Sequence, residues 1–165
     1  MSSSILQPSW TKALLLAFAL TQPAPAAADA AEAVLAGVNA ERAKAGCAPL
    51  KVNPRLVAAA RAHAKAMAEQ NFFGHTGKDG SKSGNRIRRQ GYSFRAAAEN
   101  IAAGQESVSQ VLGSWLGSPG HRRNILNCRL KETGIAVVYQ PDDRPIQGQS
   151  RPFRYYWVQV FAAPK

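Results

Sequence analysis

In three segments, within about residues 34–38, 56–67 and 108–116, apolar residues recur every three or four positions, which is the spacing of one face of an α-helix. Asp29 and Glu32 have the spacing of a capping box and predict the start of a first helix, and Gly46 is typical of the left-handed residue that ends one. Asn53 and Pro54 are typical of the N-cap and first turn of a second helix. The expected helices cover about residues 30–45, 54–70, 84–90, 108–117 and 119–127.

The last third of the chain changes to a pattern that is typical of β-strands. Residues 133–139 and 155–161 are rich in β-branched and aromatic residues, and a polar segment with several Pro and Gly residues joins them. The pattern predicts two antiparallel strands connected by a long loop. Because the helices come first and the strands last, we expect an α+β fold in which helices pack on an antiparallel sheet.

The N-terminal segment has the order of a secretory signal peptide. A lysine precedes the apolar run Ala13–Leu20, and small residues follow a stretch with two prolines. We expect cleavage after Ala28, with Ala30 as the alternative site, so that residues 1–28 are the signal peptide and residues 29–165 form a single domain. A retained membrane anchor is the other interpretation, although eight apolar residues are too few to span a bilayer. The protein is therefore expected to be secreted, to the extracellular space or the periplasm.

The chain contains two cysteines, which are too few for a disulfide-dense small domain or a four-cysteine zinc site. Export places them in an oxidising compartment, so Cys47 and Cys128 are expected to form one disulfide. The alternative is a free nucleophilic cysteine that pairs with a histidine.

Positive charge dominates the composition. The 165 residues include 21 Lys and Arg against 10 Asp and Glu, a net charge of +11, and loss of Lys12 with the signal peptide leaves +10. The segment 77–95 holds six basic residues with Asp79 as its single acid, and its glycines indicate a surface loop with one short helix. This charge favours anionic lipid head groups or cell-wall polymers as partners, although a merely soluble cationic surface explains it equally well. Nucleic acid is not expected, because aromatic residues do not interleave with the basic ones.

Three histidines and one glutamate are the candidate functional side chains. His63 lies on the apolar face of its predicted helix and is expected in the core. His75 begins a loop and His121 lies in the first turn of a short helix, positions that favour functional side chains. Glu99 stands in a run of alanine and isoleucine, so its carboxylate is expected to be partly buried and to have either a donor partner or a raised pKa. Two imidazoles and a carboxylate form a donor set for zinc or another divalent cation, although the spacing alone does not show that they meet.

Five motifs in chain order resemble the CAP superfamily, which comprises cysteine-rich secretory proteins, antigen 5 and pathogenesis-related 1 proteins and is also called the SCP-like extracellular domain. The run from Ser118 to Leu126 is the most specific, and the chain is similar to the short bacterial, secreted branch of the family. The resemblance extends over about residues 32–163. The motifs are Phe73-Gly74-His75-Thr76, Ala98-Glu99-Asn100-Ile101-Ala102, Trp115 to Leu126, Gly134-Ile135-Ala136-Val137 and Tyr156 to Phe161.

The resemblance implies an α-β-α sandwich, with an antiparallel sheet between helical layers, and a cleft that holds two histidines and two glutamates. In some members of the family these side chains bind a divalent metal such as zinc. By motif, His75 and His121 match the two histidines, and Glu99 matches one glutamate. Ser118 occupies the second glutamate position and cannot act as a base or as a charge partner, so the site resembles a triad and lacks the fourth group.

Members of the family do not share one activity, so the resemblance does not choose a function. A cleft of this kind is compatible with two functions. The first is a secreted, monomeric binding module whose cleft holds a divalent ion and whose basic surface contacts anionic envelope, lipid or host polymers. The second is a metal-assisted, peptidase-like hydrolase of the cell envelope. In that enzyme His75 and His121 would hold the metal, and Glu99 would act as the base or orient a ligand.

A third function is that of a sterol or lipid carrier with an apolar groove between helices. Phe72, Phe73 and Tyr92 flank the basic segment and could line such a groove, but packing in the core explains these aromatic residues equally well. Whether the protein is an enzyme is left open by the sequence.

Overall fold

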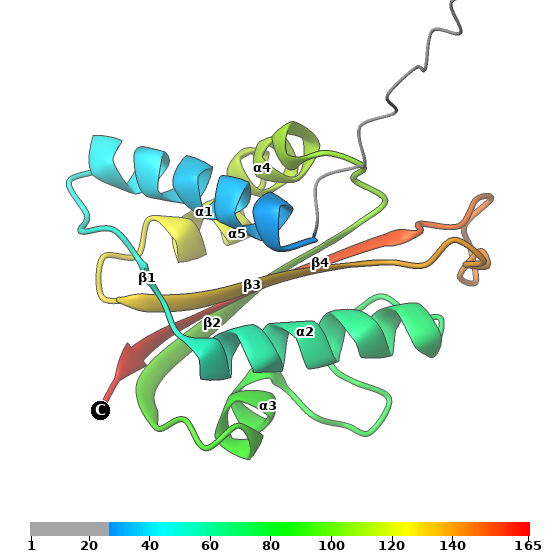
Figure 1. Cartoon of the computed structure of the whole chain (residues 1–165), viewed down its shortest axis with the longest axis horizontal. Coiled ribbons are helices and arrows are strands. Elements are labelled where there is room, and N and C mark those ends of the chain that lie inside the picture. Colours follow the sequence, from blue (N-terminus) through cyan, green and yellow to red (C-terminus); the bar gives the residue numbers. More distant parts are fainter. Residues whose placement is uncertain (1–26) are drawn as a thin grey trace, which may run out of the picture.

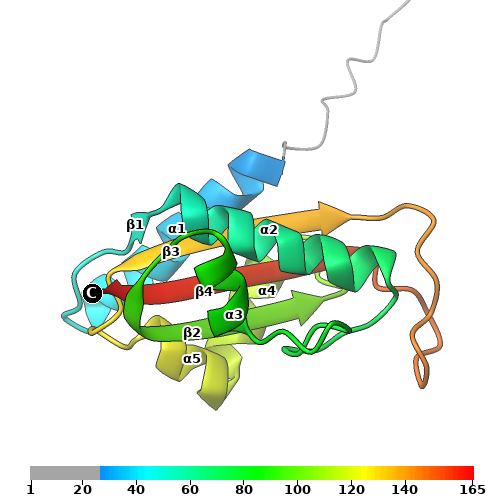
Figure 2. The same ribbon diagram turned by 90° about the horizontal axis from the view of Figure 1, so that it is seen from below.

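The computed structural model describes residues 27–165 (Figure 1), so the predicted signal peptide lies outside the described residues except for its last two positions. The elements are α1 (Ala27–Lys44), β1 (Lys51–Val52), α2 (Pro54–Glu69), α3 (Ser83–Arg89), β2 (Phe94–Ala103), α4 (Val108–Gly117), α5 (Pro119–Ile125), β3 (Glu132–Tyr139) and β4 (Tyr155–Pro164). Helices α1, α4 and α5 cover one face of the sheet, and α2 and α3 cover the other (Figures 1 and 2). This arrangement confirms the expected α+β fold with an α-β-α sandwich. None of the helices between Ala27 and Lys165 combines the length and the apolar character that crossing a bilayer requires.

The sheet has the strand order β1-β3-β4-β2. β4 lies in the middle and pairs antiparallel with both β3 and β2, whereas the two-residue β1 pairs parallel with the start of β3. β2 is therefore one edge of the sheet, and most of β3 forms the other edge because β1 is so short. The two strands predicted at the end of the chain are confirmed as an antiparallel pair.

The two faces of β4 belong to different hydrophobic cores. Tyr156 and Val158 pack on the α2 side, whereas Trp157 packs with Trp115 of α4 on the other side. A strand that is covered on both faces buries nearly all its side chains, and residues 156–163 of β4 are all buried.

The aromatic residues considered for a groove are mostly core residues. Tyr92 is buried on the α2 side and Phe72 packs against the same core, which confirms core packing for these two. Phe73 is 43% exposed, and its ring lies beside that of Phe153.

The sequence pattern did not predict strand β2. Five of its ten residues are alanine, which favours helices and is depleted in strands. β2 nevertheless pairs with β4 from Phe94 to Ala103, so long-range hydrogen bonding outweighs the local preference of the alanines.

The helix ends agree with the sequence at two of three positions. Asn53 Oδ1 accepts a hydrogen bond from the backbone N–H of Arg55, which confirms the cap of α2. Gly46 has a φ of +73° just beyond α1 and confirms its end. The capping box of Asp29 and Glu32 is wrong: α1 already includes Ala27, so Asp29 lies in the first turn, where its charge still interacts favourably with the helix dipole.

Arg42 is fully buried in the last turn of α1, although arginine is rarely buried without an acidic partner. All five N–H groups of its guanidinium donate to backbone carbonyls at 2.7 to 3.1 Å. Nε and Nη2 donate to Ala48, Nη1 donates to Ile125 and Asn127, and Nη2 also donates to Leu130. Burial lowers the pKa of Arg42, but guanidinium stays protonated in proteins. The side chain therefore acts as a charged clamp between α1 and the segment that follows α5.

Cys47 and Cys128 form a disulfide, as predicted. Both cysteines of the chain are used, which excludes a free nucleophilic cysteine. The disulfide joins the loop after α1 to residues 126–131, the connection from α5 to β3. Together with Arg42 it fixes this connection against the end of α1.

Candidate functional site

The predicted site residues lie around the β2 edge of the sheet. Glu99 is on β2, His75 is in the loop after α2, and His121 is in the first turn of α5. α3 and α5 flank β2 from opposite helical layers (Figure 2), so groups from both layers reach this edge.

Glu99 is the centre of a hydrogen-bonded cluster. Its side chain is only 3% exposed. Arg86 Nη2 donates to both carboxylate oxygens, at 3.1 Å to Oε1 and 2.8 Å to Oε2, and His75 Nδ1 lies 2.9 Å from Oε1. Burial by itself raises the pKa of Glu99, but the hydrogen bond from His75 and the charge of Arg86 outweigh it and hold the pKa below its ordinary value. The carboxylate therefore has donor partners, one of the two expected outcomes, and is ionised at neutral pH.

Arg86 is the site residue that the sequence analysis missed. It lies on α3 and is 6% exposed, and it also donates to the backbone carbonyls of Ser81 and His75, at 2.7 and 3.0 Å. One guanidinium thus holds both Glu99 and the loop that carries His75. In the sequence Arg86 is one of several arginines in a basic segment, and no local signal distinguishes it from its exposed neighbours.

His75 is oriented by Glu99 and open to solvent. Its side chain is 57% exposed, and its Nε2 makes no hydrogen bond with any residue between 27 and 165. An ionised carboxylate at Nδ1 favours the tautomer that carries its proton there, which leaves a free lone pair on Nε2. The pair can therefore accept a proton or a hydrogen bond at Nε2.

His63 lies behind this pair as part of the same cluster. It is 1% exposed, which confirms its place in the core. Its Nε2 lies 2.9 Å from the carbonyl oxygen of Gly74 and 4.0 Å from Glu99 Oε1. A carbonyl only accepts, so Nε2 carries the proton and donates. Burial lowers the pKa of His63 more than the charge of Glu99 raises it, so the ring is neutral at pH 7 and positions the segment that leads to His75.

His121 lies beside the cluster and makes no hydrogen bond or ion pair with Glu99 within the described part of the chain. Asn100 Nδ2 donates to the backbone carbonyl of His121 at 3.2 Å, and Asn124 donates to the backbone carbonyl of Glu99 and to Asn100 Oδ1. These amides attach α5 to β2. Burial and, to a lesser extent, repulsion by His75 lower the pKa of His121.

This arrangement does not fit the predicted metal donor set. Both oxygens of Glu99 accept from Arg86, whose positive charge would repel a cation bound to the same carboxylate. Ser118 is the N-cap residue of α5 and adds no carboxylate. Across residues 27–165, no group of three or more His, Cys, Asp and Glu side chains is placed to hold a metal ion. Zinc binding by His75, His121 and Glu99 stays a prediction that the observed contacts do not favour.

A second feature, the basic hollow, lies where β2 begins. Its cavity of about 620 Å³ is lined by Arg95, Ala96, Cys128, Arg129, Lys131 and Ala163. The three basic side chains are exposed, and none forms an ion pair with an acid between residues 27 and 165. Two of them stand on the connection that the disulfide and Arg42 hold in place. The sequence analysis noted Arg95 as part of the basic segment 77–95 but did not group it with Arg129 and Lys131, because only the fold brings these distant segments together.

The sequence model of the CAP family, described as the cysteine-rich secretory protein family, matches residues 35–161. The chain belongs to the CAP family. The uncharacterized protein YkwD of Bacillus subtilis is 36% identical over 119 residues, which are 72% of this CAP chain and 46% of YkwD. The uncharacterized membrane protein YlbC of the same organism is 31% identical over 99 residues, 60% of this chain and 29% of YlbC. The CAP chain thus spans less than half the length of these two curated relatives.

Two solved structures share the CAP fold of this chain. An extracellular protein containing an SCP domain from Bacillus anthracis superimposes with a TM-score of 0.68 at 24% identity, covering 82% of this chain and 40% of that one. An outer surface protein from Borrelia burgdorferi gives a TM-score of 0.72 at 22% identity, covering 83% of this chain and 94% of that one. At these identities the likeness establishes the fold and no shared activity.

Proposed function

We propose that this CAP domain is an exported binding protein that holds an anionic polymer of the cell envelope in the basic hollow. The observation that carries the proposal is the convergence of Arg95, Arg129 and Lys131 on one cavity without acidic partners in the described part of the chain. Cations that no nearby acid neutralises keep their attraction for phosphate or carboxylate groups of a partner.

The hollow is also held in shape before any partner arrives. Arg129 and Lys131 follow Cys128 closely, and the disulfide to Cys47 anchors this connection to the loop after α1. Arg42 adds hydrogen bonds to three carbonyls between residues 125 and 130. Cations on a rigid backbone lose less conformational entropy on binding than cations on a mobile loop.

Export of the protein, to the extracellular space or the periplasm, is part of the proposal. The predicted signal peptide and the pairing of both cysteines support it. The structural relative from Bacillus anthracis is described as an extracellular protein, which agrees with this location.

The metal-assisted hydrolase has less support than the binding protein. It requires Glu99 as a base or as an orienting group, and both oxygens of Glu99 are engaged by Arg86. The contacts among Glu99, Arg86 and His63 order the loop that carries His75. A binding protein also needs ordered loops, so these contacts do not require catalysis.

Replacing Arg95, Arg129 and Lys131 together by glutamine is expected to weaken binding to heparin, used as a soluble anionic polymer. The dissociation constant should rise about 100-fold at low salt, because each cation close to an anionic surface contributes about 1 kcal/mol. Isothermal titration at several salt concentrations measures both the loss and the weaker salt dependence that follows from it.

A matched control replaces Lys82, Arg144 and Arg151 by glutamine, which removes the same charge from exposed positions outside the hollow and outside the cavity beside α5. It should weaken heparin binding by less than about fivefold, since distant exposed charges are screened. An equal loss in both triple variants would show that the net charge alone binds the polymer and would reject the hollow as a site. If the protein bound phosphatidylglycerol vesicles more strongly than heparin, the partner would be an anionic membrane and not a polymer.

A further inference from the structure

The edge of β3 opposite β4 is largely free of a neighbouring strand. β1 pairs with β3 at Glu132 and Thr133 alone, so between residues 27 and 165 no strand covers the edge from 134 to 139. The carbonyl of Thr133 points to this side, because it accepts from the backbone N–H of Asn53. In an antiparallel pair the direction of the peptide groups alternates, so the N–H and C=O groups of Ile135 and Val137 point to the same open side.

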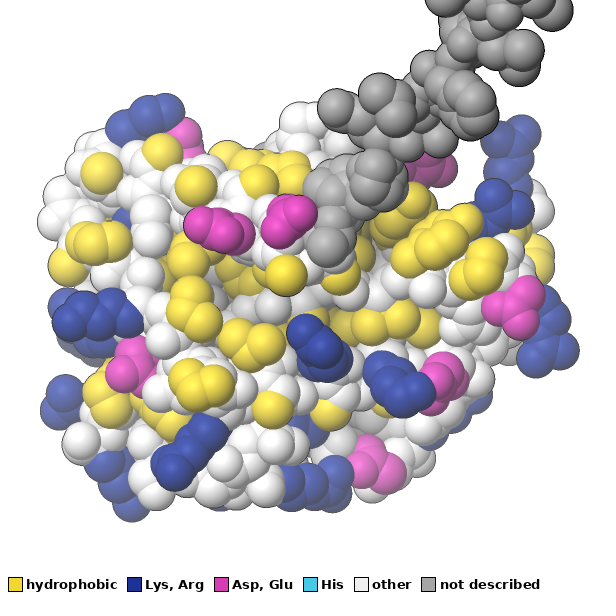
Figure 3. Space-filling model, in the orientation of Figure 1, with side chains coloured by type: hydrophobic (Ala, Val, Ile, Leu, Met, Phe, Trp, Pro, Cys, Tyr) yellow, Lys and Arg dark blue, Asp and Glu magenta, His cyan; other side chains and the backbone are white. Residues whose placement is uncertain are grey.

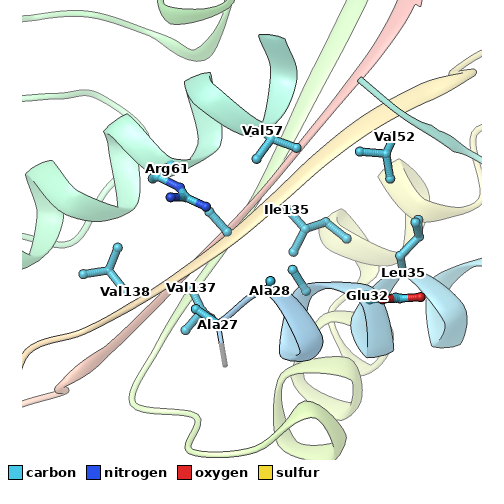
Figure 4. A pocket seen from close by; sticks show the side chains of 12 residues that line it. Ala27, Ala28, Glu32, Leu35, Val52, Val57, Arg61, Ile135, Val137 and Val138 are labelled. Atoms are coloured by element: carbon cyan, nitrogen blue, oxygen red, sulfur yellow. The ribbon is translucent and has the colours of Figure 1, made fainter. Parts of the chain in front are cut away.

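This edge is the floor of an apolar groove between α1 and α2. Figure 3 shows hydrophobic side chains gathered in the hollow between these two helices, and Figure 4 shows the residues that line it. The cavity measures about 500 Å³, within the range of roughly 300 to 1,000 Å³ that is usual for ligand sites. Its lining includes Ala31 and Leu35 of α1, Val57 of α2, and Ile135 and Val137 of β3, all of which lie beyond the predicted cleavage site.

The rim of the groove carries one charge of each sign. Glu32 stands on α1 and Arg61 on α2, both exposed (Figure 4). Neither forms an ion pair with another residue in the described part of the chain. The groove therefore combines an apolar lining, a row of backbone donors and acceptors, and two free charges.

We propose that this groove binds an extended peptide segment as an additional strand on the edge of β3. The segment would continue the line of β1 and exchange backbone hydrogen bonds with Ile135 and Val137, which is recognition by β-strand addition. The short side chain of Ala31 on the α1 wall leaves room for a small apolar side chain of the peptide. An acidic group near Arg61 and a basic group near Glu32 would complete the match in charge.

Two other occupants fit the same groove less well. An acyl chain or a sterol would fill the apolar groove but would exclude water from the edge N–H and C=O groups. Such a ligand could not replace the hydrogen bonds that these groups make with water. A second copy of this chain cannot pair its own β3 edge here, because that edge is equally recessed between two helices. An extended peptide is thin enough to enter and supplies both donors and acceptors.

The test selects random seven-residue peptides on purified protein and measures the best one by fluorescence anisotropy. Val137→Pro removes one outward N–H, and proline is tolerated at an edge position whose N–H faces away from the sheet. We expect the peptide to bind this variant at least tenfold more weakly than the original chain. The matched control, Val137→Ala, keeps the N–H and removes only part of the apolar lining, so it should weaken binding clearly less than Val137→Pro does.

Amide hydrogen exchange tests the same site without a substitution, in case Val137→Pro fails to fold. In the free protein the amides of Ile135 and Val137 should exchange faster than those of Gly134 and Ala136, which point to β4. The selected peptide should slow exchange at Ile135 and Val137 specifically.

Three results would overturn the proposal. The first is that no peptide is selected on the original chain. The second is equal affinity for Val137→Pro and the original chain, or no added protection at Ile135 and Val137. The third is that a solvent extract of the purified protein contains an acyl lipid or a sterol in stoichiometric amount, and that the Val137→Pro variant retains the same molecule. This result would assign the groove to an apolar ligand. The groove is separate from the basic hollow, so this proposal and the proposed function fail independently.

Discussion

Replacing Arg42 by methionine is expected to lower the free energy of unfolding by about 4 kcal/mol. Methionine fills much of the space of arginine but donates no hydrogen bond. The carbonyls of Ala48, Ile125, Asn127 and Leu130 would therefore lose the donor that now satisfies them inside the protein. Because domains of this size have a total stability of about 5 to 15 kcal/mol, the loss should be evident in the midpoint of urea denaturation.

Two further variants define the cause of this loss. Arg42→Lys keeps the charge but has three donors in a different geometry, so it should recover only part of the stability. Arg123→Met removes an exposed arginine on α5 and should change the stability by less than about 0.5 kcal/mol. A loss below about 1 kcal/mol for Arg42→Met would mean that the clamp contributes little net stability and that the disulfide alone holds the connection.

Gly134→Ala should lower the free energy of unfolding by about 3 kcal/mol or more. A Cβ atom at this position would overlap the backbone of Leu56 and Val57 in the first turn of α2. Backbone atoms cannot turn aside as a flexible side chain can, so α2 would have to move away from β3. Thermal and urea unfolding of the purified variant measure the loss, and failure to accumulate as folded protein has the same meaning.

Gly113→Ala serves as the opposite control. Gly113 lies on α4, is exposed, and has open space where a Cβ would stand. Alanine favours a helix over glycine by about 0.5 to 1 kcal/mol, so this variant should be more stable than the original chain. A destabilising effect of the same size at both glycines would contradict the steric explanation for Gly134.

Arg42 and Gly134 both support the backbone that forms the proposed binding surfaces. Arg42 holds the connection that carries two cations of the basic hollow, so Arg42→Met should also weaken heparin binding where the variant stays folded. Gly134 allows α2 to lie directly on β3, and this close approach sets the wall of the apolar groove.

The site was predictable in its residue types but not in its contacts. His75, Glu99 and His121 were found because histidines outside apolar faces and a carboxylate within an apolar run are unusual in sequence. The contacts of Glu99 with Arg86 and His63 were not found. These contacts depend on how α2 and α3 are positioned and rotated relative to β2, and no local sequence pattern encodes this packing.

The sequence by itself determined the features that depend on near neighbours. A helical face repeats every 3.6 residues, a cap involves residues three positions apart, and β-branched runs favour strands without regard to their partner, so these could be predicted from short windows. Only the tertiary structure decided that the alanines of β2 form a strand, because that depends on pairing with β4 more than 50 residues later. It also decided that Arg42 and Arg86 are buried while other arginines stay exposed, since a buried guanidinium is stable only where distant carbonyls or a carboxylate are brought within hydrogen-bond distance.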